Sequence, residues 1–159
     1  MQYILMSVFT LIVVALDQFT KYLTLQNIPL YGHVDLLPGF IGLTYVQNRG
    51  AAFSILQNAQ WLFAIIFVVI AAFIVWEFSK KRLPFTDFER WLIVAIFAGG
   101  IGNTIDRLRF GFVVDMIQTE FMNFPVFNVA DCFITCGCLL LIAHLFLFNK
   151  EFWKEEKKK

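Results

Sequence analysis

The stretch WLFAIIFVVIAAFIVW, residues 61–76, decides the fold class because it contains no charged and no amide side chain. A helix needs about 20 apolar residues to cross roughly 30 Å of hydrocarbon. Together with three further apolar stretches, it predicts membrane-spanning helices over about residues 3–25, 60–78, 91–108 and 127–148. None of the four stretches has the alternation of barrel strands, so helices are the expected spanning elements.

The composition of the whole chain agrees with a membrane protein. Of its 159 residues, 59% are hydrophobic and 16% are charged, whereas a soluble domain has roughly 25% charged residues. One globular core of this length cannot cover so much apolar surface. The net charge of +1 gives no electrostatic support for a nucleic-acid partner. We therefore expect a single membrane domain over residues 1–159.

Basic residues are distributed unequally among the connections. Nine of the 13 Lys and Arg lie in the 79–90 connection and the C-terminal tail, so the positive-inside rule predicts that both termini are cytoplasmic. Residues 26–59 then form an extracytoplasmic segment, in which FIGLTYVQ (40–47) is typical of a short strand or hairpin. The expected fold is an all-α membrane protein, with four transmembrane helices and a small extracytoplasmic β-containing cradle over 26–59.

Four aspartates lie near the predicted outer ends of the helices, where a charge is costly and marks a functional candidate. Asp17 and Lys21 are spaced i, i+4 and are predicted to pair. A paired Asp106 is expected to fix the end of the third helix. Asp115 and Asp131 have no basic residue within three positions, so their apolar surroundings favour the neutral form.

If Asp115 and Asp131 lie close together, one holds a proton while the other stays ionised. Such a pair can activate water and protonate a carbonyl oxygen, which is aspartyl peptide hydrolysis. Spacing alone leaves a proton-relay or packing role equally open. His33, in a predicted loop, and the distant His144 give no nucleophile an evident partner. A small transporter or channel subunit using these carboxylates as a proton relay, and a non-catalytic assembly factor, therefore stay as alternatives.

Small residues recur in the third apolar stretch. The pairs Ala95/Gly99 and Ala98/Gly102 are each four residues apart, a spacing that lets membrane helices approach closely. We therefore expect close helix contact along this face.

Five segments together resemble the bacterial lipoprotein signal peptidase (signal peptidase II) family. The matching segments, in family order, are DQFTK at 17–21, NRGAAFS at 48–54, GGIGNTIDR at 99–107, GFVVDM at 111–116 and FNVAD at 127–131. The resemblance covers nearly the whole chain. One departure is Met116, where the family more often has Phe.

The resemblance implies an intramembrane aspartyl peptidase without a metal or cofactor, in which Asp115 and Asp131 form the catalytic dyad. Its implied substrates are diacylglyceryl-modified prolipoproteins, cleaved just before the lipidated Cys. It also implies contact with membrane lipid, binding of globomycin-type inhibitors, and an active site at the outer leaflet of the bacterial cytoplasmic membrane. The implied substrate-binding or supporting residues are Asp17, Lys21, Asn48, Gly50, Asn103, Asp106, Arg107 and Asn128.

Overall fold

The computed structural model describes residues 1–50 and 60–154. The elements within these residues are α1 (Gln2–Asn27), β1 (His33–Leu37), β2 (Ile41–Asn48), α2 (Gln60–Lys80), α3 (Asp87–Phe110), β3 (Val113–Thr119), α4 (Val129–Leu147) and α5 (Lys150–Lys154). Residues 51–54 of the NRGAAFS segment lie outside the described residues.

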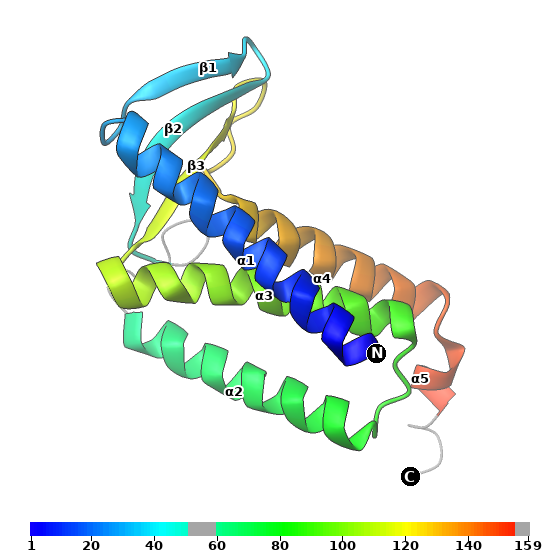
Figure 1. Cartoon of the computed structure of the whole chain (residues 1–159). Helices are drawn as coiled ribbons and strands as arrows, with labels where there is room; N and C mark the ends of the chain where they lie inside the picture. The colour runs from blue at the N-terminus through cyan, green and yellow to red at the C-terminus, as the bar shows by residue number, and fades with distance from the viewer. Residues whose placement is uncertain (51–59, 155–159) are drawn as a thin grey trace.

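The four long helices make up most of the described chain, and α3 contacts each of the other three. Figure 1 shows the sheet at one end of the helices, with the N-terminus and α5 at the opposite end. All four helices are long and apolar enough to cross a membrane, with mean hydropathies between 1.2 for α3 and 2.5 for α2. Large apolar side chains of α2, such as Val68 and Val75, are exposed. The expected class, a four-helix membrane protein with a small β region, is confirmed.

A capping box starts α3 four residues before the expected Trp91. The Thr86 side chain accepts a hydrogen bond from the backbone N–H of Glu89, and the Glu89 carboxylate accepts one from the N–H of Thr86. Such reciprocal bonds satisfy amides that the first turn leaves without partners. The polar residues before the apolar stretch are therefore helical.

The sheet contains three antiparallel strands in the order β1-β2-β3. The strand expected within 40–47 is β2. The third strand, β3, lies outside residues 26–59, so the sheet extends beyond the segment expected to form the cradle. It forms because Gly111 ends α3 in the left-handed conformation, with φ of 74°, and the following FVVDMI is rich in residues that favour strands. His33 begins β1 and is not in a loop.

An apolar cluster joins the sheet to the end of α1. Ile28 packs with Tyr45 of β2 and with Val114 and Met116 of β3, all of them buried. Because β3 also follows directly from α3, two helices and this cluster fix its position. The fold thereby holds Asp115 of β3 close to the helix ends.

Candidate active site

The side chain of Asn128 connects Asp115 and Asp131. Asn128 caps α4: its Oδ1 accepts a hydrogen bond from the Asp131 N–H (2.9 Å), and its own N–H donates to Asp131 Oδ2 (3.2 Å). Its Nδ2 donates to Asp115 Oδ1 (2.6 Å). One helix cap therefore places a carboxylate of α4 beside a carboxylate of β3.

Two further asparagines orient the remaining carboxylate oxygens. Asn48, the last residue of β2, donates through Nδ2 to Asp115 Oδ2 (3.0 Å). Asn103 of α3 donates through Nδ2 to Asp131 Oδ1 (2.7 Å). Each of the four carboxylate oxygens thus accepts a hydrogen bond, and both side chains are held in fixed orientations.

Asp115 is 2% exposed, which sets its electrostatics. Burial, and then the nearby Asp131 carboxylate, raise the pKa of Asp115 to about 7. Hydrogen bonds from Asn48 and Asn128 and the charge of Lys21 lower this pKa, but they do not offset the burial. Asp115 therefore keeps a proton close to neutral pH beside a second carboxylate.

Lys21 is the centre of a buried group of charges. Its Nζ lies 2.9 Å from Asp17 Oδ2 and 3.0 Å from Asp106 Oδ2, and it donates to Asn103 Oδ1 (3.0 Å). These contacts engage all three ammonium protons. The expected i, i+4 pair is confirmed, and Asp106 is paired as expected. Its described partner, however, lies on α1.

The same aspartates hold the backbone beside the Asp115–Asp131 pair. Asp17 Oδ1 accepts the N–H of Ala130 (2.9 Å), and Asp106 Oδ2 accepts the N–H of Val114 (3.0 Å). Ala130 and Val114 each come immediately before one aspartate of the pair. The buried charges therefore fix the positions from which both carboxylates project.

Arg107 connects α3 to the end of β2. Its Nη1 donates to the Asn103 carbonyl (3.1 Å) and its Nη2 to the Gly50 carbonyl (3.0 Å). The Gly50 N–H donates in turn to Asn48 Oδ1 (3.0 Å). The guanidinium also lies over the ring of Phe63 of α2, 4.7 Å from its centroid.

All ten residues singled out in the sequence lie in one hydrogen-bonded network. Sequence reasoning did not single out Gln18. Its Nε2 donates to Asp106 Oδ1 (2.9 Å), to Asp17 Oδ2 (3.2 Å) and to the Gly102 carbonyl (3.2 Å). The signal that could have found Gln18 is an amide beside a charged residue within an apolar helix.

Asn128 joins two carboxylates at one end of four apolar helices, and one of the two carboxyl groups is still protonated near neutral pH. This arrangement is suited to general acid–base chemistry. The fold and the site are therefore those of a membrane-embedded aspartyl hydrolase.

Comparisons with known proteins agree with this class. A family described as signal peptidase (SPase) II matches residues 9–147. The lipoprotein signal peptidase of Streptococcus agalactiae serotype Ia is 42% identical over 161 residues, which cover 98% of this chain and 96% of that protein. The lipoprotein signal peptidase of Streptococcus thermophilus is 43% identical, with 98% and 97% covered. The chain belongs to the signal peptidase II family.

A solved structure has a similar fold. A bacterial membrane enzyme determined by the in meso method at 2.3 Å resolution has a TM-score of 0.85 and 34% sequence identity, over 92% of this chain and 90% of that one. The chain is therefore a multi-pass membrane peptidase of the signal peptidase II type. The transporter alternative receives no support from these comparisons.

Proposed function

We propose that this peptidase removes signal peptides from diacylglyceryl-modified prolipoproteins by cutting just before the lipidated Cys, with Asp115 and Asp131 as its catalytic dyad. The observation that carries the proposal is the Asn128 bridge between the two carboxylates. Support for the substrate comes from the relatives, which are lipoprotein signal peptidases.

In the first step, Asp131 accepts a proton from water while the water oxygen attacks the scissile carbonyl carbon. Asp131 lies in the first turn of α4, where the helix dipole favours negative charge. Asp115, with its raised pKa, donates its proton to the carbonyl oxygen. The product of this step is a neutral tetrahedral diol.

In the second step, Asp131 donates its new proton to the peptide nitrogen as the C–N bond breaks. Asp115 takes the proton of one hydroxyl group as the carbonyl re-forms. The signal peptide leaves with a free carboxyl group and the lipoprotein with a free amine. Both aspartates return to their starting protonation states.

The other network residues support the dyad in this proposal. Asn48, Asn103 and Asn128 orient the carboxylates. Asp17 and Asp106, both paired with Lys21, hold the adjacent backbone. Arg107 and Gly50 lie next to Asn48, where the substrate backbone would bind. The residues in these positioning roles are Asp17, Lys21, Asn48, Gly50, Asn103, Asp106, Arg107 and Asn128.

The proposed location is the bacterial cytoplasmic membrane, with both termini cytoplasmic and the active site at the outer leaflet. The excess of Lys and Arg in the 79–90 connection and the tail supports this orientation. The acyl chains of the substrate would lie in lipid beside the exposed apolar helix surfaces, and globomycin-type inhibitors would occupy the substrate site. The proposal treats residues 1–159 as one membrane domain.

The test uses the purified full-length protein and a synthetic diacylated prolipoprotein peptide in detergent micelles, with products measured by mass spectrometry. We expect Asp115→Asn and Asp131→Asn each to lower the cleavage rate by at least about 100-fold, because each removes a proton-transfer group. Thermal unfolding is measured in parallel to show that the variants fold.

The matched control is Asp87→Asn, because Asp87 lies at the opposite end of α3 from the dyad and its described side-chain bond is to Gln2. We expect this control to cleave like the wild type. Wild-type cleavage by either dyad variant would remove that residue from catalysis. A wild-type protein that binds the peptide without cutting it would overturn the proposed activity.

A further inference from the structure

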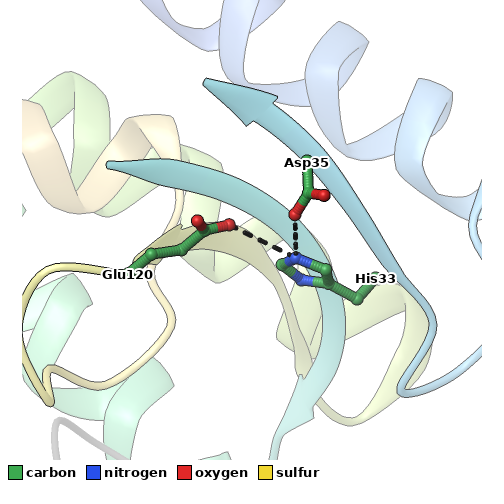
Figure 2. Close-up of side chains that lie close together, drawn as sticks. All are labelled: His33, Asp35 and Glu120. Atoms are coloured by element: carbon green, nitrogen blue, oxygen red, sulfur yellow. Dashed lines mark hydrogen bonds and ion pairs between the residues drawn. The ribbon is translucent and has the colours of Figure 1, made fainter. Parts of the chain in front are cut away.

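A second group of ionisable side chains lies on the sheet, away from the dyad. His33 and Asp35 project from β1, and Glu120 follows β3 (Figure 2). His33 Nε2 lies 2.9 Å from Asp35 Oδ1 and 3.3 Å from Glu120 Oε1. Glu120 is five residues beyond Asp115, about 16 Å along an extended strand, so the cluster is separate from the active site.

The strand register places these side chains on one face of the sheet. Asp35 pairs with Gly42, which pairs with Gln118, and His33 pairs with Thr44. Paired residues share a face, and so do residues two apart along a strand. Glu120 is two residues beyond Gln118 and therefore lies on the same face.

Hydrogen bonds orient the imidazole ring of His33. Thr44 Oγ1 donates its single proton to Gln118 Oε1 (2.5 Å), so it accepts a hydrogen bond from His33 Nδ1 (2.7 Å). A neutral imidazole protonated at Nδ1 presents a lone pair at Nε2. His33 Nε2 faces two carboxylates (Figure 2), and a positive charge at this point, carried by a proton or by a metal ion, stabilises the arrangement.

Glu120 is also held in place for such a contact. Its Oε2 accepts the backbone N–H of Gly39 (2.7 Å). Its Oε1 faces His33, is buried, and accepts no hydrogen bond from the described residues. A Cβ atom on Gly42 would overlap the imidazole ring and lie 2.6 Å from this oxygen. The glycine therefore leaves the space in which the two groups approach.

We propose that His33, Asp35 and Glu120 bind a divalent transition metal such as Zn²⁺ through Nε2, Oδ1 and Oε1. Imidazole with carboxylates suits such metals, and the three ligand atoms lie within 4.8 Å of one another. Bonds of 2.0–2.2 Å in a tetrahedral site separate the ligands by about 3.3 Å, close to the 2.9 and 3.3 Å observed here.

Water can complete the coordination, because His33 and Glu120 also line an open cavity of about 660 Å³. The imidazole and Asp35 are exposed, so a metal can enter without unfolding the sheet. The bound ion would join β1 to the end of β3 across β2. Its effect would be to brace the outer part of the sheet, and it would take no part in peptide cleavage.

The test is calorimetric titration of the metal-free, full-length protein in detergent micelles with ZnCl2. We expect one equivalent of zinc to bind to the wild type, with much weaker binding of MgCl2. His33→Gln and Glu120→Gln should each weaken zinc binding by at least about 10-fold. Thr44→Val should also weaken it by about 10-fold, because it loses the group that orients the imidazole. Zinc should raise the unfolding temperature of the wild type more than that of His33→Gln.

The matched control is Glu151→Gln, which removes an exposed carboxylate at the other end of the molecule. It should bind zinc like the wild type. Zinc binding that is absent from the wild type, or equal in His33→Gln and the wild type, would overturn the proposal. In that case the cluster would be an ion pair of protonated His33 and nothing more.

Discussion

Asp115 and Asp131 have identical side chains in different surroundings. Asp131 lies in the first turn of α4 and accepts a backbone N–H, so the end of the helix stabilises its charge. Asp115 lies in a strand, is buried, and accepts only side-chain amides among the described contacts. This difference separates the acid from the base in the proposed mechanism.

The pH dependence of cleavage should report the proton on Asp115. Because its pKa is raised to about 7, the protonated form is present below this pH and is lost as the pH rises through it. We therefore expect kcat to fall as the pH rises above about 7. Asn48→Leu removes a hydrogen bond that lowers this pKa, so it should move the basic limb to higher pH. The measurement is a kcat–pH profile.

Gln47→Leu is the control for this profile. The Gln47 side chain donates to the Tyr45 hydroxyl, and it is not among the groups that shift the pKa of Asp115. Its basic limb should coincide with that of the wild type. A basic limb that stays in place in Asn48→Leu, or moves to lower pH, would show that the limb belongs to another group.

Sequence patterns identified these residues but did not identify all of their hydrogen-bond and ion-pair partners. The i, i+4 spacing predicted the contact of Asp17 with Lys21, because both lie on one helix face. The contact of Lys21 with Asp106 joins two helices, and no local spacing encodes it. The bond from Asn48 to Asp115 spans 67 positions. Which carboxyl keeps the proton depends on such distant contacts.

Among the elements, β3 is one that the sequence did not predict, and it carries Asp115. Its residues follow a long helix and precede another, so an extended helix or a return loop was also consistent with the spacing. Pairing with β2, more than 60 positions earlier, decides that they form a strand. Tertiary contacts of this kind commonly override local preference. The strand then determines where Asp115 lies.

Close packing of α3 against α4 should be sensitive to a single methyl group. A Cβ atom on Gly99 would lie 2.5 Å from the carbonyl oxygen of Ala130 and 2.8 Å from Cγ1 of Ile134. Since the backbone oxygen cannot move alone, Gly99→Ala should push away the turn that carries Asp131. We expect a loss of about 1–3 kcal/mol in stability and an approximately 10- to 100-fold lower cleavage rate. Thermal unfolding and a kinetic assay measure the two effects.

Gly100→Ala is the matched control, because it makes the same substitution at the next position. There the new Cβ atom would meet only the ring of Phe67, at 2.9 Å, and a ring at the end of a side chain can move. Any gain in helix propensity from Gly to Ala applies to both variants. Equal losses at positions 99 and 100 would show that the α3–α4 approach does not position the dyad.

At the scale of the whole molecule, the carboxylate network and most of the described basic residues lie at opposite ends of the helices. The sheet and the carboxylate network lie at one end of the helices, and the N-terminus and α5 lie at the other (Figure 1). The basic residues between positions 79 and 90, where α2 connects to α3, are Lys80, Lys81, Arg82 and Arg90. The distribution of charge was readable from sequence because it needs only the order of spans and loops.

This division predicts which end faces outward, and cysteine labelling measures it. With the native cysteines replaced by Ala, Leu36→Cys in the exposed part of β1 and Glu151→Cys in α5 provide one reporter at each end. In right-side-out vesicles, a membrane-impermeant maleimide should label position 36 directly and position 151 only after detergent is added. The reverse pattern would place the dyad at the cytoplasmic face. A substrate anchored by its acyl chains in the outer leaflet could then not reach the dyad, so the labelling result also decides whether the proposed substrate and the proposed site are compatible.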